Sequence, residues 1–288
     1  MQTKSAIMMR VLLNGFHQGS FESFLSCLPG TEAQEVLAQQ IDSGDPLPAL
    51  AQPLEKLTRI HYSWLVPLVE KLPADVREVM VKALPEPHQT KVAQALKLEL
   101  KAEPLADLVQ IYLVDELYQR LKGAPEVLPP DYLPRTAISG LTEWKKDELL
   151  DLIDLLGLHD LTEEIRQVVD KKKLQSIYSC LNKRELQYLQ HNLLRKEKIA
   201  TPSLGLDRWN GDCKKLKSVM HSRGLVRLGK ALSGEHPDIL WHIMHALDQG
   251  RGEALQKVYS KKPLPGVTGP LSQQVQGIIN ILKKKSDE

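Results

Sequence analysis

Residues 60–84 read IHYSWLVPLVEKLPADVREVMVKAL, and residues 235–259 read EHPDILWHIMHALDQGRGEALQKVY. The two stretches align without a gap at a constant offset of 175 residues. The matching positions include His61 with His236, Leu65 with Leu240, Leu68 with Ile243, Leu72 with Leu247 and Met80 with Leu255. Internal repeats of this kind are typical of stacked helical hairpins, which present a surface and not an active-site cleft. The repeat therefore predicts a scaffold or adaptor.

The remaining segments also show the periodicity of helices. Apolar residues recur every three or four positions, as at Leu149, Leu152 and Leu156, and Gly157 is expected to end that helix. We find no convincing alternation of apolar and polar residues, which is the pattern of a half-buried strand. The sequence therefore predicts an all-α fold of armadillo- or HEAT-like stacked helical hairpins in two halves.

Proline-rich segments divide the chain. Residues 123–134 (GAPEVLPPDYLP) hold four prolines, so they cannot be helical throughout and are predicted to be a linker. This linker would separate an N-terminal helical domain (1–122, with the first repeat at 60–84) from a C-terminal one (135–260, with the second repeat at 235–259). Residues 261–288 are expected to form a second linker and a terminal helix.

The composition is that of a globular chain. Of the 288 residues, 42% are hydrophobic and 26% are charged, which is enough to bury a sizeable core. The formal net charge of +2 gives no global field that points to nucleic acid or a membrane surface. No apolar run approaches the ~20 residues of a membrane helix. The short apolar run at 7–13 is interrupted by Arg10, and no small-residue cleavage site follows it, so we predict no signal peptide.

The three cysteines, Cys27, Cys180 and Cys213, are far apart in the sequence and lack CxxC spacing. An odd number of isolated cysteines indicates reduced, partly buried thiols in a reducing compartment. We therefore expect a cytoplasmic protein.

One segment imitates a phosphate-binding loop. Residues 224–230 fit the pattern GxxxxGK, but Ala231 stands where that loop needs Ser or Thr to hold Mg²⁺. The motif also requires a preceding hydrophobic strand, whereas a Lys-rich helical stretch precedes this one. The pattern thus favours a helix face over the nucleotide-dependent enzyme that it could otherwise indicate.

Three histidines lie close together in the second repeat, at His236, His242 and His245. Two of them, His242 and His245, have a spacing at which they could share a metal ion with an aspartate. The first repeat has no equivalent of this pair, so the repeat does not need it. His61 and His236 occupy the same place in both copies, which indicates capping or packing near the start of a helix.

The densest basic region of the chain lies between residues 214 and 230. It contains Lys214, Lys215, Lys217, His221, Arg223, Arg227 and Lys230. On a helix, Lys214, Lys217 and His221 would share one face. Three interpretations remain open: a patch for an acidic protein partner, a solvated face without a partner, or a nucleic-acid surface.

The repeats resemble the EHPQ-type segment of the flagellar rotor-switch protein FliG. In that family, a Glu-His-Pro-Gln start leads into an apolar helix, a Leu-Asp-Pro turn and a second helix that ends near Leu-Pro. Glu235, His236 and Pro237 match this start, Asp238 replaces the Gln, and the first copy keeps only His61.

This resemblance implies an armadillo-like helical protein on the cytoplasmic side of a membrane-embedded ring, which it joins to further ring subunits. The charged motor helix of FliG has no counterpart that we can find here, which argues against a role in torque. The related machine without a motor is the type III secretion injectisome. An SctK-like adaptor of its sorting platform would suit the size and helicity of this chain.

We therefore predict a non-enzymatic cytoplasmic adaptor of a type III secretion or flagellar-type apparatus, peripheral to a membrane ring that it bridges to ring or pod subunits. The alternative is a HEAT-like nucleic-acid-binding protein that uses the basic 214–230 stretch. We expect no catalytic residue, cofactor or metal ion. The residues predicted to bind a partner are Lys214, Lys217, His221, Arg223, Arg227, Lys230, His236, Asp238 and Arg251.

Overall fold

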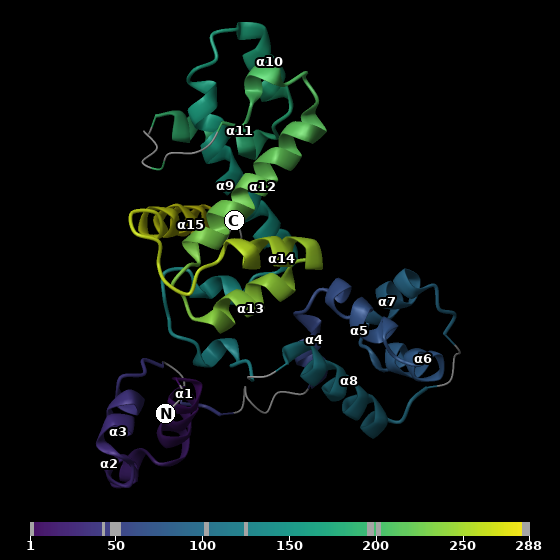
Figure 1. Ribbon diagram of the computed structural model, residues 1–288, viewed down its shortest axis with the longest axis vertical. Coiled ribbons are helices and arrows are strands. Elements are labelled where there is room, and N and C mark those ends of the chain that lie inside the picture. The colour runs from purple at the N-terminus through teal and green to yellow at the C-terminus, as the bar shows by residue number, and fades with distance from the viewer. Residues whose placement is uncertain are drawn as a thin grey trace. The chain divides into compact units, whose positions relative to one another are not determined.

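A computed structural model describes residues 3–41, 44–46, 53–100, 104–123, 126–194, 199 and 203–283. All regular secondary structure in these ranges is helical (Figure 1). The all-α fold class is thus confirmed, whereas armadillo-like stacking stays a prediction.

The chain forms two compact units. Unit 1 comprises Met1–Trp144 and His236–Gly252, and unit 2 comprises Lys145–Glu235 and Glu253–Glu288. Unit 1 contains α1 (Thr3–Phe16), α2 (Phe21–Ser26), α3 (Gly30–Leu37), α4 (Pro53–Thr58), α5 (Val66–Glu70), α6 (Ala74–Ala83), α7 (His88–Leu96), α8 (Asp107–Lys122) and α13 (Pro237–Ala246). Unit 2 contains α9 (Lys146–Ile165), α10 (Lys171–Ser179), α11 (Lys183–Leu193), α12 (Cys213–Ala231) and α15 (Thr268–Lys283). The division falls inside α14 (Gln249–Val258). The 3-10 helices include η1 (Gln18–Ser20), η3 (Tyr62–Trp64), η4 (Pro130–Tyr132), η5 (Ser139–Glu143) and η6 (Leu206–Arg208).

The division differs from the one expected at the proline-rich segment. Within unit 1, Leu128, Tyr132 and Leu133 of that segment are buried. The backbone of Leu128 is fixed from both sides, since its N–H donates to Asp238 Oδ2 (2.9 Å) and its carbonyl accepts from His242 Nε2 (2.7 Å). Proline prevents a continuous helix, but it does not prevent burial. Residues 124–125 lie outside the described ranges.

Both repeats fold as pairs of short helices. The first copy supplies η3, α5 and α6, and the second supplies α13 and α14. Leu65 with Leu240 and Met80 with Leu255 are buried in both copies, whereas Leu68 is only partly buried. The apolar period therefore identified part of the side that faces the core, because Val76 and Val79 of α6 are 37% exposed.

The paired histidines act as caps, as the repeat predicts. The imidazole of His61 accepts a hydrogen bond from the backbone N–H of Ser63 (3.3 Å), and that of His236 accepts one from Asp238 (3.2 Å). Each ring thus satisfies one of the unpaired donors at a helix start. The equivalent histidines therefore cap a helix start in both copies.

The two repeats also bind each other inside unit 1. His61 N–H donates to the His245 carbonyl (2.7 Å), and the Trp64 indole N–H donates to the Leu247 carbonyl (2.9 Å). Gln249 N–H donates to Ser63 Oγ (2.9 Å). The start of the first copy therefore closes the end of the first helix of the second copy, whose last carbonyls would otherwise lack partners.

Unit 2 is organised by the crossing of α9 and α12. A Cβ at Gly157 would overlap the carbonyl oxygen of Met220, and a Cβ at Gly224 would overlap that of Ile153. The two backbones thus touch where both helices have glycine. Gly157 lies in the middle of α9, so its expected role as a helix end is wrong. Helix α15 packs on both helices and buries Leu271, Val275, Ile278 and Ile279, as the sequence predicts for the terminal helix.

We expect Gly224→Ala to destabilise unit 2 by at least about 2 kcal/mol, because the helices must separate to admit one methyl group. Gly277→Ala is the matched control. It lies in α15, where a Cβ would meet no described atom within 4 Å, and alanine there should stabilise the helix by up to about 1 kcal/mol. Urea unfolding, followed by amide exchange in α9 and α12, measures both. Equal stability of the two variants would contradict the close crossing.

Candidate protein-interaction surface

The basic region predicted at 214–230 is one helix, α12, in unit 2. Residues 224–231 are helical and include Gly224 and Gly229, so they form no phosphate loop. Asp212 is the N-cap, and its carboxylate accepts from the backbone N–H groups of Lys214 (2.9 Å) and Lys215 (3.2 Å). The cationic side chains of this helix have different environments along its length.

Arg227 is not a surface residue. It is only 4% exposed, and its Nε donates to Oδ1 of Asp160, which is 3% exposed (2.8 Å). Its Nη1 donates to Gln274 Oε1 (2.7 Å), so one guanidinium links α9, α12 and α15. The prediction that Arg227 contacts a partner is therefore wrong. Charge patterns cannot separate a buried ion pair from a solvated one, because the partner is 67 residues away in sequence.

Three further basic residues of α12 lie partly inside unit 2. His221 Nδ1 is 2.6 Å from Asp154 Oδ1, and Arg223 donates to the Ser203 carbonyl (3.1 Å). Lys230 is half-buried, and its carbonyl accepts from Thr268 Oγ1 (3.1 Å). These contacts make His221 and Arg223 poorer candidates for partner binding than the lysines at the start of the helix.

The exposed lysines of α12 are Lys214, Lys215 and Lys217. Lys217 pairs with the buried Glu185 of α11 (3.4 Å). The first turns of the neighbouring helices carry exposed cations too, at Lys171 and Lys172 of α10 and Lys183 of α11. Residues 170–194 and 203–217 together hold nine Lys and Arg against four Asp and Glu, whereas the whole chain has a net charge of only +2.

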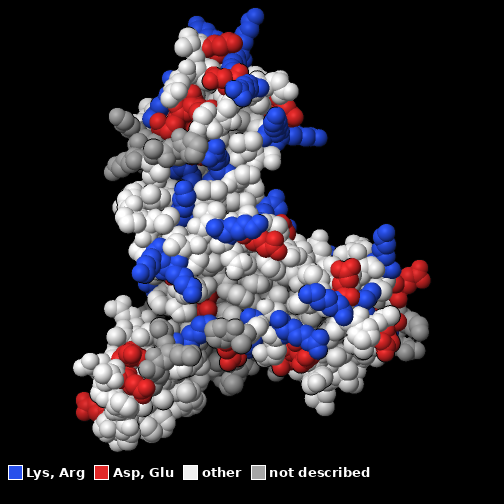
Figure 2. Space-filling model, viewed as in Figure 1, with Lys and Arg blue, Asp and Glu red and all other residues white. Residues whose placement is uncertain are grey.

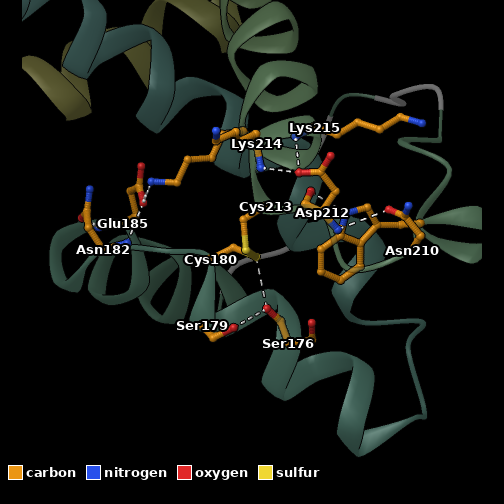
Figure 3. The surroundings of a disulfide bond; sticks show 12 residues. Ser176, Ser179, Cys180, Asn182, Glu185, Asn210, Asp212, Cys213, Lys214 and Lys215 are labelled. Carbon is orange, nitrogen blue, oxygen red and sulfur yellow. Dashed lines mark hydrogen bonds and ion pairs between the residues drawn. A yellow bond between two sulfur atoms is a disulfide. The ribbon is translucent and has the colours of Figure 1, made fainter.

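A disulfide bond between Cys180 and Cys213 joins the end of α10 to the start of α12 (Figure 3). Cys213 directly precedes Lys214 and Lys215, whose backbone N–H groups donate to Asp212 in Figure 3. The expectation that these two cysteines are free thiols is therefore wrong, while Cys27 is free and exposed. Spacing alone did not reveal the pair, because 33 residues and a whole helix separate the two cysteines.

We use the name α10–α12 surface for the exposed residues of α10, α11, α12 and their flanks, six lysines and two aliphatic residues: Lys171, Lys172, Lys183, Lys214, Lys215, Lys217, Val169 and Leu194. Val169 is 93% exposed and Leu194 is 87% exposed. In Figure 2, Lys and Arg side chains project from the end of unit 2 that carries α10, with Asp and Glu side chains between them. Five of these eight residues, namely Lys171, Lys172, Lys183, Val169 and Leu194, were missed from the sequence.

A signal for the missed part is present in the sequence. Asp170, Asn182 and Asp212 are N-caps, and each is followed directly, or after one residue, by two or three cations. Cations in a first turn oppose the helix macrodipole and cost about 0.3–1 kcal/mol each. Two or more cations after an N-cap in three successive helices are therefore the pattern that marks this part of the chain in the sequence.

The other predicted partner residues belong to unit 1. Asp238 is 4% exposed, where it accepts from Leu128 N–H and pairs with Lys4 Nζ (2.9 Å). Its role is therefore internal, and the prediction that it contacts a partner is wrong. His236 caps α13, and Arg251 pairs with Asp248. Among the described residues, the His236 and Arg251 side chains thus make these contacts within the second repeat.

The two histidines whose spacing could suit a metal ion, His242 and His245, each donate a hydrogen bond to a backbone carbonyl. His242 Nε2 donates to the Leu128 carbonyl (2.7 Å), and His245 Nδ1 donates to the Trp241 carbonyl (2.8 Å). Burial lowers the pKa of His242 and lowers that of His245 to about 4. The His245 ring also stacks on Trp241 at 4.0 Å and lies 4.4 Å from Trp64. No group of three possible ligands that could hold a metal occurs in the part of the chain that is described.

No protein-family model matches this chain, and neither a curated protein nor a solved structure does. Within the described ranges, no helix is both long and apolar enough to cross a bilayer.

We predict that Arg227→Met destabilises unit 2 by about 3 kcal/mol, because the buried Asp160 carboxylate then keeps only the more distant Arg223 (3.9 Å) as a cationic partner. Arg227→Met combined with Asp160→Leu should recover most of this loss, since it removes both charges. The matched control is Lys215→Met at an exposed position of the same helix. Urea unfolding of the four proteins measures the free energies, and a double variant as unstable as the single one would refute the ion pair's role.

We also predict that acid weakens unit 1 through His245. The pKa of its imidazole falls from 6.5 in the unfolded chain to about 4 in the fold, so the unfolded state takes up the proton first. The contribution of neutral His245 is complete above pH 6.5, decreases between 6.5 and 4, and changes no further below that. The total is about 3 kcal/mol. Unfolding measured from pH 7.5 to 4 should show a shallower decline for His245→Phe than for the exposed control His191→Phe.

Proposed function

We propose that this protein is a helical adaptor that works through protein–protein contacts, with the α10–α12 surface as its main docking face. The observation that carries this proposal is the exposure of six lysines and of Val169 and Leu194 on α10, α11, α12 and their flanks. Exposed aliphatic side chains gain free energy when a partner covers them. The ammonium groups select a partner that is acidic.

Backbone N–H groups at the three helix starts of this surface already have hydrogen-bond partners. The caps Asp170, Asn182 and Asp212 use backbone N–H groups of α10, α11 and α12. A phosphate would have to displace these caps before it could bind to the backbone. The lysine side chains are therefore what a partner meets, and a patch of acidic and apolar side chains complements them better than a phosphate backbone does.

The repeat supports one class of assembly for this adaptor. Its resemblance to FliG supports a place beside a membrane ring in a flagellar-type or type III secretion apparatus, in the manner of an SctK-like subunit. Ring or pod subunits would then be the acidic partners, and the location would be cytoplasmic. A reducing cytoplasm would open the Cys180–Cys213 bond. The oxidation state of these two cysteines in protein alkylated inside its native cells therefore tests the location. Free thiols would support a cytoplasmic location, and an intact disulfide bond would contradict it.

Charge reversal tests the surface. The variant Lys171→Glu, Lys214→Glu, Lys215→Glu spares Lys217, which neutralises the buried Glu185. We expect it to reduce the amount of ring and pod subunits co-purified from native cells at least about tenfold, because like charges then face the partner. Lys257→Glu, Lys261→Glu, Lys262→Glu is the matched control, because it reverses three exposed lysines elsewhere in unit 2.

Equal capture by the two triple variants would disprove the docking face. Tight binding of DNA or RNA that weakens steeply with salt, and that is lost in the first variant, would instead support the nucleic-acid alternative.

A further inference from the structure

Helix α10 has few attachments to the described part of unit 2 other than the Cys180–Cys213 disulfide bond. Of its nine residues, only Ile177 is buried. Among the described residues, one side-chain hydrogen bond leaves this helix, from Lys173 Nζ to the Asp207 carbonyl (3.4 Å). A helix as short as this one is only marginally stable in water by itself. The place of α10 therefore depends strongly on its bond to α12.

The disulfide bond is accessible from one side. Cys180 is buried, whereas Cys213 is partly exposed as the first residue of α12, directly after the exposed cap Asp212. An attacking thiolate can thus approach the Cys213 sulfur. The Cys180 sulfur lies 3.2 Å from the Ser176 carbonyl oxygen (Figure 3). That oxygen can accept a hydrogen bond from the thiol that reduction creates, so the fold has a place for the reduced form too.

The third cysteine indicates the redox conditions in which the bond occurs. Cys27 is an exposed free thiol. Exposed thiols persist in a reducing compartment, where a disulfide bond in the same chain is usually transient. The proposed cytoplasmic location implies the same conditions. Under them, a bond between two cysteines is typical of a redox sensor.

We propose that Cys180 and Cys213 form a thiol switch, which fixes α10 to α12 when oxidised and releases α10 when reduced. In the reducing step, one thiolate of a dithiol reductant attacks the Cys213 sulfur, the S–S bond breaks, and Cys180 leaves as a thiolate that takes up a proton. The second thiol of the reductant then displaces Cys213, which also ends as a thiol. The reductant becomes a disulfide, and the protein has gained two electrons and two protons.

A hydroperoxide reverses this change. It oxidises one of the two cysteine thiols to a sulfenic acid and is itself reduced to an alcohol, or to water if it is hydrogen peroxide. The other thiol then attacks the sulfenic sulfur, which forms the disulfide and releases water. The reduced form is the resting state in a reducing compartment, and the oxidised form appears when hydroperoxides accumulate.

The switch also changes the α10–α12 surface, and this consequence rests on the proposed function. The bond fixes α10, which carries Lys171 and Lys172 and follows Val169, relative to the start of α12, which carries Lys214 and Lys215. A docking face whose parts are held in place loses less conformational freedom on binding. The oxidised form should therefore bind an acidic partner more tightly than the reduced form does.

Amide hydrogen exchange of the full chain tests the switch, with the protein oxidised and after treatment with a dithiol reductant under native conditions. We expect exchange of residues 171–180 to become at least about tenfold faster on reduction, because the cross-link no longer limits the opening of α10. Exchange in α11 should change much less, because α11 packs on α9 and buries Leu189 there. Hydrogen peroxide, added after the reductant is removed, should restore slow exchange.

Two variants separate this bond from other effects of the reagents. Cys213→Ser should show fast exchange in α10 under both conditions. Cys27→Ser is the matched control, since it removes the free thiol and keeps the bond, and it should respond as the wild type does. If Cys213→Ser fails to fold, the reduced and alkylated wild type replaces it. A bond that the dithiol does not open in the folded protein, or equal exchange of α10 in both states, would overturn the proposal.

Binding of a fluorescent helical peptide rich in glutamate and leucine tests the effect on docking. The oxidised protein should bind this probe several-fold more tightly than the reduced protein, and the variant Lys171→Glu, Lys214→Glu, Lys215→Glu should bind it weakly in both states. Equal affinities in the two states, with α10 released in one, would overturn the effect on docking. Equal affinities of the wild type and the triple variant would instead contradict the docking face, and amide exchange would still decide the switch.

Discussion

Contact between the backbones of α9 and α12 is the constraint on which unit 2 depends. Gly157 and Gly224 let the two helices touch, and this proximity allows Arg227 to reach Asp160 in a region closed to water. A buried pair of this kind contributes little when it is intact and costs much when it is broken. It therefore fixes which sides of α9, α12 and α15 meet. Once those sides are fixed, Lys214 and Lys215 remain at the exposed start of α12.

The repeat has an internal use in unit 1. Each copy starts with a histidine cap, and the two copies are joined by hydrogen bonds between the η3 segment and the end of α13. The aromatic stack of Trp64, His245 and Trp241 fills the contact between them. Because His245 is neutral in this stack, the same arrangement that packs the copies together makes unit 1 sensitive to acid. The likeness of the two copies is thus at least partly a matter of packing.

Cations in this chain do three different things. Arg227 holds a core together, the lysines of the α10–α12 surface remain in water, and Arg10 stacks over the Phe21 ring at 4.6 Å. Their sequence neighbourhoods hardly distinguish them, since each lies next to or near apolar residues in a helix. Burial and the presence of a distant carboxylate decide their roles. Surface binding is proposed only for the cations that the fold does not use.

Interactions between residues close in sequence let the sequence by itself determine the helices, part of their buried faces, the histidine caps and the absence of a complete phosphate-loop motif. These features depend on residues a few positions apart, such as His61 and Ser63 or Leu65 and Leu72. The tertiary structure alone decided the bond between Cys180 and Cys213, the ion pair of Arg227 with Asp160 and the hold of Asp238 on Leu128. Those partners are 33 to 110 residues apart. No periodicity encodes such distances, because the chain is brought back to the same place only by the packing of whole helices.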